Sequence, residues 1–210
     1  MSAGLPDRES PSGEPAALDA GARALLFTEA RTANTFTDEA VSEAQLHELV
    51  ELAKWPPTSA NTNPLRILFV RSVEARARLV SHMSDGNKAK TQTAPMVAVL
   101  AADMEFYEHI PRLLPFRPEL REVFAADEAL RERQALFNAT LQAGYFILAV
   151  RAVGLAAGPM GGFDRDGVDS DFFLDRPWRS ILVVNVGHPG IEPWFDRLPR
   201  FSYDEMTLEI

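Results

Sequence analysis

Three short apolar runs in this chain predict buried β-strands. They comprise residues 66–70, 96–102 and 180–187. Apolar side chains occupy both faces of each run, which is typical of strands inside a sheet that is covered on both sides. Residues 155–159 are interpreted instead as a short segment that leads into a glycine-rich turn.

Apolar residues at helical spacing predict helices in the first half of the chain. These helices cover residues 16–30, a segment between Ser42 and Trp55, and residues 73–82. Ser42 and Gln45 have the spacing of a capping box at the start of the second helix, and the following prolines prevent its continuation. Gly86 and Asn87 indicate a turn after the third helix.

A long helical pattern covers about residues 128–153, polar at first and then almost wholly apolar through residues 143–150. A helix that is apolar all round is expected to be buried on all sides, in the core or at a subunit interface. Asp164 can cap one further helix, which runs to about residue 173. Prolines 111, 115 and 118 predict an irregular segment, and the last twenty or so residues are expected to be extended.

Helices and strands alternate here without the strict order of βαβ units, so the sequence predicts an α+β fold. Residues 1–15 are rich in Gly, Ser, Pro and charges and cannot bury enough apolar surface to fold alone. They are predicted to form a disordered or extended arm. Residues 16–210 are predicted to form a single domain.

Composition excludes several classes of protein. With 46% hydrophobic and 24% charged residues, the 210 residues suit one globular domain. The net charge of −9 argues against a nucleic-acid partner, because phosphates would be repelled. No apolar run is long enough to cross a membrane, and no secretory signal precedes the first helix. We therefore expect a cytoplasmic protein that binds neither nucleic acid nor a membrane.

The sequence predicts no metal site and no catalytic side chain. It contains no cysteine, which excludes disulfides, iron–sulfur clusters, thiolate zinc sites and a thiol nucleophile. The four histidines are scattered and form no pair with metal-ligand spacing. Neither a G-x-S-x-G elbow nor a glycine-rich phosphate loop is present.

The loop of residues 54–64 is rich in polar groups held between prolines. Pro56, Pro57 and Pro64 restrict its backbone near both ends. Hydroxyl and carboxamide side chains between them can bind the polar edge of a neutral ligand: Thr58, Ser59, Asn61, Thr62 and Asn63. The same residue types are common in turns, so an ordinary turn is the alternative interpretation.

Two other features could contact a ligand. The glycines of residues 158–162 allow a flat ligand to approach backbone N–H groups, although a tight turn before a helix would also explain them. Arg31, Arg197 and Arg200 carry guanidinium groups suited to a phosphate, although each could instead form an exposed ion pair.

Four segments together resemble the FMN-dependent nitroreductase family: residues 31–34 (RTAN), 57–61 (PTSAN), 154–163 (GLAAGPMGGF) and 197–200 (RLPR). Their order and spacing also match. Within the family, they are most similar to the malonic semialdehyde reductases of the Rut pyrimidine-degradation pathway. The resemblance covers about residues 25–205. It implies a central mixed or antiparallel sheet flanked by helices, and an intertwined homodimer that encloses two FMN molecules.

The resemblance also implies which residues of this sequence bind FMN. Arg31, Thr32 and Asn34 would hold the phosphate and the ribityl chain, with Arg197 or Arg200 also at the phosphate. Four residues would reach the flavin from the partner subunit: Pro57, Thr58, Ser59 and Asn61. Three would make polar contacts: Asn87, Lys90 and Gln142. Four would run beside the ring and place a backbone N–H near its N5: Pro159, Met160, Gly161 and Gly162.

Such a protein would transfer a hydride from NADH or NADPH to a small aldehyde, and the resemblance implies reduction of malonic semialdehyde to 3-hydroxypropanoate. Because the flavin performs the redox chemistry, no catalytic side chain is required. Two alternatives remain. One is a broad reductase of nitroaromatic compounds or quinones, and the other is a flavin-binding protein or dimeric scaffold without catalysis.

Overall fold

The computed structural model describes residues 17–210, in two units. The first unit ends at Ala30 and contains a short helix, α1 (Ala20–Arg23), that continues as a π-helical turn, η1 (Ala24–Thr28). The helix predicted over residues 16–30 is therefore present but shorter. The predicted arm of residues 1–15 lies outside the described residues, and a single domain over residues 16–210 stays a prediction.

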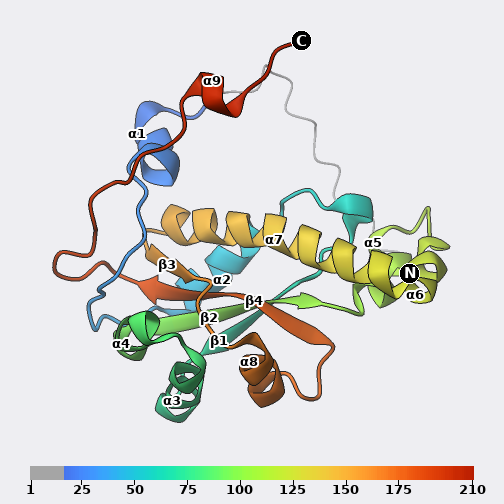
Figure 1. The fold of residues 1–210 in the computed structure, drawn as a ribbon, viewed down its shortest axis with the longest axis horizontal. Helices are drawn as coiled ribbons and strands as arrows, with labels where there is room; N and C mark the ends of the chain where they lie inside the picture. The colour runs from blue at the N-terminus through green and yellow to red at the C-terminus, as the bar shows by residue number, and fades with distance from the viewer. Residues whose placement is uncertain (1–16) are drawn as a thin grey trace. The chain divides into compact units, whose positions relative to one another are not determined.

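A four-stranded sheet forms the centre of the second unit, Arg31–Ile210 (Figure 1). Its strands lie in the order β1-β2-β4-β3, and every neighbouring pair is antiparallel. The strands are β1 (Leu65–Val70), β2 (Met96–Asp103), β3 (Ala156–Met160) and β4 (Trp178–Gly187). The predicted α+β class is confirmed, and the sheet is antiparallel rather than mixed.

Both edge strands depart from the sequence prediction. β1 is an edge strand and only half-buried before Val70, so its interior position was predicted wrongly. β3 is absent from the prediction because Gly158 and Pro159 have low strand propensity. Pro159 is tolerated there because β3 lies at the opposite edge and pairs with β4 alone.

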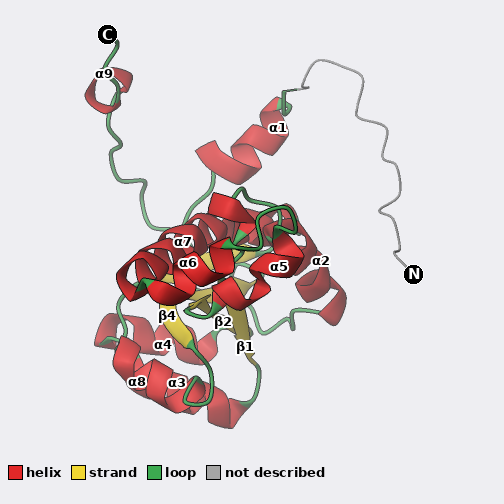
Figure 2. Ribbon diagram, turned by 90° about the vertical axis from the view of Figure 1, so that its right-hand side faces the viewer, coloured by secondary structure: helices red, strands yellow, loops and turns green. Residues whose placement is uncertain are grey.

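Helices cover both faces of the sheet (Figures 1 and 2). One layer consists of α2 (Glu43–Ala53) and α7 (Glu128–Ala152). The other consists of α3 (Val73–His82), α4 (Asp85–Thr93) and α8 (Arg165–Phe172). Each begins after a polar residue, and the predicted capping box of α2 is confirmed, with the Gln45 N–H donating to Ser42 Oγ at 3.2 Å.

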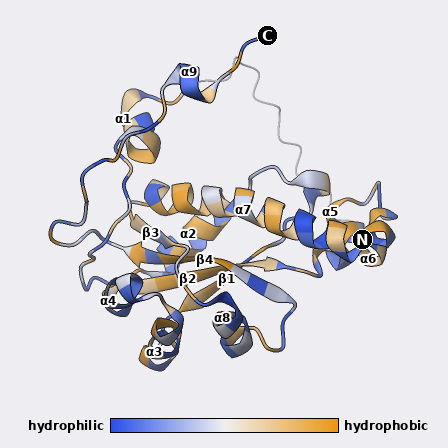
Figure 3. Ribbon diagram, viewed as in Figure 1, coloured by the Kyte–Doolittle hydropathy of each residue, from blue (hydrophilic) through white to orange (hydrophobic). Residues whose placement is uncertain are grey.

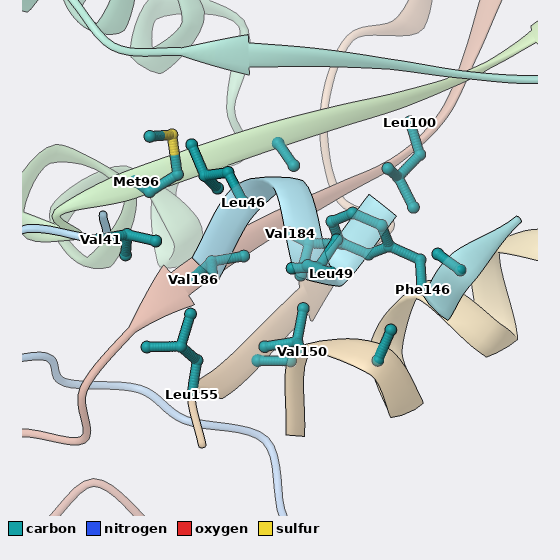
Figure 4. Close-up of a cluster of buried hydrophobic side chains, with 14 of the residues drawn as sticks. Val41, Leu46, Leu49, Met96, Leu100, Phe146, Val150, Leu155, Val184 and Val186 are labelled. Atoms are coloured by element: carbon teal, nitrogen blue, oxygen red, sulfur yellow. The ribbon is translucent and has the colours of Figure 1, made fainter. Parts of the chain in front are cut away.

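Alternation along β2 divides the core into two halves. Met96 and Leu100 face α2 and α7, while Val97 and Val99 face the other layer. All of β2 is buried, and most of its residues are hydrophobic (Figure 3). Figure 4 shows side chains of the first half gathered between α2, α7 and β4: Leu46, Leu49, Phe146, Val150, Val184 and Val186. Each such buried side chain contributes about 2 kcal/mol to folding.

Short helices connect β2 to α7, in place of the irregular segment predicted from the prolines. They are η3 (Phe106–His109), α5 (Ile110–Leu113) and α6 (Leu120–Ala126). Pro111 lies in the first turn of α5, where a missing N–H costs nothing. Phe106 and Phe124 pack edge to face, 5.2 Å apart, and anchor these helices against the first half of α7.

One further prediction was wrong. Gly86 and Asn87 lie in the first turn of α4 rather than in a turn, because Asp85 favours a helix N-terminus and the buried Thr91 of α4 contacts Met160 of β3. Helix α7 is not buried on all sides within a single chain, so its complete burial in the core is ruled out, while its burial at a subunit interface stays a prediction. Phe137, Leu141 and Tyr145, spaced four residues apart, are 59%, 41% and 44% exposed and form one apolar stripe.

Residues 188–210 form a C-terminal arm that is extended, as predicted, apart from one helical turn, α9 (Tyr203–Met206). The arm starts beside the main body, where Pro189 forms a β-bridge with Phe36. Farther along, most of its large apolar side chains are exposed: Ile191, Phe195, Leu198, Phe201, Leu208 and Ile210.

Candidate functional site

The polar loop, residues 54–64, leaves α2 and enters β1 through one 3-10 turn, η2 (Ser59–Asn61). Ala60, Asn61 and Asn63 have left-handed backbones with φ of 51°, 49° and 44°. Residues other than glycine adopt this conformation at a cost of about 1 kcal/mol each, so surrounding contacts must hold them. Strained positions of this kind cluster at binding sites.

Helix α7 and the last residue of α5 supply some of those contacts. The Ser59 N–H donates to Oδ1 of Asn138, a fully buried residue of α7, at 2.7 Å. The Asn61 carboxamide donates to the Leu113 carbonyl at 2.8 Å, and the Asn63 N–H donates to Thr58 Oγ1 at 3.3 Å. Both ends of η2 are thereby fixed.

Gln142 of α7 belongs to the same group. Its Oε1 accepts a hydrogen bond of 2.9 Å from the Leu65 N–H, and its Nε2 lies 3.4 Å from Asn63 Oδ1. A cavity of about 420 Å³ lies beside the loop, lined by Lys54, Trp55, Pro56, Asn61, Asn63, Leu65, Arg66 and Gln142. Of the predicted partner-side residues, the structure thus places Asn61 at this cavity, together with Gln142.

The glycine loop, residues 160–163, begins at the last residue of β3 and contacts α4. The Gly162 carbonyl accepts hydrogen bonds from Asn87 Nδ2 at 2.9 Å and from the Ser84 N–H at 3.1 Å. A Cβ on Gly162 would lie 3.0 Å from Asn87 Nδ2, whereas a Cβ on Gly161 would meet nothing within 4 Å. The loop is pinned at Gly162 and open at Gly161. Lys90 lies three residues after Asn87, on the neighbouring turn of α4.

Residues 31–34 lie between β3 and the C-terminal arm. The Ala33 N–H donates to the Ala157 carbonyl at 2.9 Å, and the Asn34 N–H donates to the Pro193 carbonyl at 3.0 Å. Gly158 makes this approach possible, because a Cβ there would lie 2.7 Å from the Ala33 carbonyl oxygen. The Thr32 carbonyl accepts from the Asn34 side chain at 3.3 Å.

The predicted phosphate-binding arginines lie on the C-terminal arm (Arg197 and Arg200) or contact it (Arg31). Arg31 Nη1 donates to the Phe195 carbonyl at 3.4 Å, two residues before Arg197. Arg200 Nη1 donates to the carbonyls of Leu198 and Pro199, both at 3.0 Å, and so bonds to its own segment. The structure brings Arg31 to the arm, but it does not select between Arg197 and Arg200.

The predicted site residues fall into two groups at opposite edges of the sheet. The polar loop leads into the start of β1, while the glycine loop follows the end of β3. Two strands lie between them, so the loops are separated by three strand spacings, roughly 14 Å. Within one chain, Ser59 and Gly161 therefore do not meet over a common ligand.

An ionic cluster lies next to the glycine loop and links α3 to α8. Arg78 Nε donates to Asp171 Oδ1 at 3.0 Å, and His82 Nε2 lies 3.1 Å from Asp171 Oδ2. The His82 carbonyl accepts from the Asp164 N–H at 2.8 Å, directly after the loop. The Arg78 guanidinium is the main reason that the pKa of Asp171 is lowered.

Replacing Asp171 with asparagine is expected to lower the melting temperature at pH 7 by about 2 °C, because the carboxylate pairs with Arg78. A carboxyl whose pKa is lowered on folding stabilises the protein above its unfolded pKa. That contribution is lost as the pH falls through the lower, folded pKa. The difference between Asp171→Asn and wild type should therefore begin to shrink as the pH falls below the ordinary aspartate value of 3.8, and vanish only below the folded pKa. Thermal unfolding at pH 7 and pH 3 measures it, and a constant difference would contradict it.

Several residues of the site escape sequence reasoning. Asn138 holds the polar loop, Ser84 holds the glycine loop, and Arg66 donates to the Asn63 carbonyl at 3.0 Å. One signal was visible in the sequence: Asn138 is a carboxamide on the face of α7 that carries Ala135 and Ala139, and a buried amide requires partners.

Over residues 17–210, no group of three or more histidine, aspartate or glutamate side chains is placed to hold a metal ion. In the same part of the chain, no helix is long and apolar enough to cross a membrane.

Residues 28–188 match the model of the nitroreductase family. This chain belongs to the nitroreductase family. It is 54% identical over 195 residues to a Streptomyces coelicolor protein provisionally named an NADH dehydrogenase/NAD(P)H nitroreductase, covering 93% of this chain and 96% of that protein. A Leptothrix cholodnii protein with the same provisional name is 49% identical over 191 residues, covering 90% of this chain and 95% of that protein.

Solved nitroreductase structures have the same fold. A nitroreductase family protein of Streptococcus pneumoniae superposes with a TM-score of 0.78 at 22% identity, covering 88% of this chain and 98% of that one. A provisionally named nitroreductase of Exiguobacterium sibiricum, solved in complex with FMN, superposes with a TM-score of 0.77 at 19% identity. The superposition covers 93% of this chain and 99% of that one. The predicted family and its fold are thereby confirmed.

Proposed function

We infer that this chain is an FMN-dependent oxidoreductase that takes a hydride from NADH or NADPH. Its membership of the nitroreductase family and the names of its relatives support this enzyme class and these cofactors. We further propose that it reduces malonic semialdehyde, that it forms a homodimer, and that particular residues contact FMN. Each of these parts has its own support.

The separation of the two loops is the observation that carries the proposed homodimer. A second copy can place its polar loop over the glycine loop of the first, which one chain cannot do. The exposed stripe of Phe137, Leu141 and Tyr145 offers an apolar surface for that contact. The exposed apolar residues of the C-terminal arm add a second such surface.

The residues present fit a bound FMN. Gly161 leaves open space beside the backbone, as a flat ring requires, and Gly162 is fixed by Asn87. Around this position the chain offers carboxamide, hydroxyl and backbone groups for the polar edge of the ring. The arginines of residues 31–34 and of the C-terminal arm supply the charge that a phosphate requires.

When bound, FMN supplies the atom that accepts a hydride from NAD(P)H and passes it to the acceptor. The chain itself binds the flavin and orients it. In the proposed roles, Met160, Gly161 and Gly162 present backbone beside the ring with Pro159, while Asn87 and Lys90 lie along its polar side. Arg31, Thr32 and Asn34 hold the phosphate end with Arg197 or Arg200. Pro57, Thr58, Ser59 and Asn61 of the partner copy, with Gln142, complete the cleft.

We propose malonic semialdehyde as the acceptor, on the motif resemblance of the polar loop, the glycine loop and residues 197–200. A broad reductase of nitro compounds or quinones is the second candidate, because the Streptomyces coelicolor relative is provisionally named a nitroreductase. We also propose the cytoplasm as its compartment. A chain without cysteine forms no disulfide and so does not require an oxidising compartment.

The purified protein is expected to be yellow, to lose its colour when NADH or NADPH is added without oxygen, and to regain it when an acceptor is supplied. Stopped-flow absorbance with each nicotinamide, followed by a panel of acceptors, measures these steps. Malonic semialdehyde should restore the colour and yield 3-hydroxypropanoate. Rapid turnover of nitroaromatic compounds and quinones, with the aldehyde left unchanged, would favour the second candidate. A colourless protein that ignores added FMN would exclude both.

A further inference from the structure

We propose that Arg66 and Asp103 are positioning residues that hold the polar loop in the geometry required by the cofactor. This inference rests on the proposed function of that loop. Arg66 is the second residue of β1, and Asp103 is the last residue of the neighbouring β2. Arg66 Nη2 lies 2.5 Å from Asp103 Oδ2.

The Arg66 guanidinium is directed at the backbone of the loop. Its Nη1 donates to the carbonyls of Asn63 and Leu65 at 3.0 and 2.9 Å. Asn63 is the last left-handed residue of the loop, so this contact fixes the end that Asn138 does not reach. The planar guanidinium can bind two carbonyls and a carboxylate at once, which an ammonium group matches poorly.

Asp103 in turn fixes Arg66. The Asp103 side chain is only 6% exposed, and its Oδ1 accepts a hydrogen bond of 2.9 Å from the Glu105 N–H. His109 Nε2 lies 4.0 Å from Asp103 Oδ2, the oxygen that Arg66 also contacts. The carboxylate therefore has little freedom, and the guanidinium that it binds has little as well.

Stability alone does not account for this pair. A buried ion pair usually gains little over apolar residues of similar size, because both charges lose their hydration. Arg66 also lies between two cavities, the one beside the polar loop and another of about 310 Å³ that Asp103 and His109 line. What the pair does supply is a fixed direction for the donors that meet Asn63.

The test compares Arg66→Met, Arg66→Lys and Asp103→Asn with Arg71→Met, a matched control. Arg71 follows the same strand, but it pairs with the exposed Glu43 and lies at the opposite end from the loop. Hydrogen exchange of residues 58–63 is measured before and after removal of FMN, and FMN affinity is measured by fluorescence titration. Melting temperature and circular dichroism check that each variant is folded.

Arg66→Met is expected to speed exchange in residues 58–63 at least tenfold and to weaken FMN binding at least tenfold, while Arg71→Met changes either value less than twofold. Arg66→Lys and Asp103→Asn should fall between them, which keeps the test decisive if Arg66→Met does not fold. Unchanged exchange in folded variants would overturn the inference. So would faster exchange with unchanged FMN affinity. If the wild type binds no FMN, the proposed function fails instead, and exchange alone decides whether Arg66 holds the loop.

Discussion

The double variant Leu141→Glu, Tyr145→Glu is expected to be a monomer that no longer retains FMN. Both residues belong to the exposed apolar stripe of α7, one turn apart. In the proposed homodimer the stripe is covered, so two buried, unpaired carboxylates would oppose association. We expect the dissociation constant of the dimer to rise by at least ~100-fold, or about 2.8 kcal/mol.

Analytical ultracentrifugation measures the association, and the ratio of flavin to protein absorbance measures FMN retention. Leu174→Glu is the matched control, because Leu174 is another exposed leucine, 80% accessible and outside α7. It should leave both values unchanged. A double variant that stays dimeric and yellow would show that the stripe is not the subunit interface.

Gly158→Ala is expected to lower the free energy of unfolding by about 2 kcal/mol, as overpacking at a tight contact does. The added Cβ would stand 2.7 Å from the Ala33 carbonyl oxygen, which is backbone and cannot rotate away. Residues 31–34 must then shift away from β3, and with them Arg31. FMN affinity is therefore expected to fall along with stability.

Gly161→Ala provides the comparison for this prediction, since a Cβ there meets nothing within 4 Å and Gly161 is not among the residues with positive φ. It should change the free energy of unfolding by less than about 0.5 kcal/mol. Urea denaturation of both variants measures the difference. Equal stability of the two variants would mean that residues 31–34 do not lie against β3 as described.

Local patterns predicted many elements because their causes lie within a few residues of one another. The capping box of Ser42 and Gln45, the helix of residues 73–82 and the buried strand of residues 96–102 are all present as predicted. Predictions from the local sequence failed where tertiary packing overrode helix and strand propensity. Gly86 lies in a helix, and Gly158 and Pro159 lie in a strand, because the sheet stabilises α4 and β4 pairs with β3.

The candidate site divides along the same line. The sequence identified the polar loop, the glycine loop and the arginines by residue type and spacing. It could not reveal Asn138 as the partner of Ser59, because 79 residues separate them. Nor could it reveal that Arg66 meets Asp103, 37 residues away, since that contact depends on the pairing of β1 with β2.

By itself the sequence determined the family, the fold class and the segments that carry the candidate chemistry, because motifs, caps and apolar runs consist of residues that are close together in the sequence. Only the tertiary structure decided that β1 and β3 are the edges of the sheet and that the two loops lie apart. It also decided that Arg66, paired with Asp103, contacts the carbonyl of the left-handed Asn63. These features arise from packing between distant segments, which no local pattern encodes.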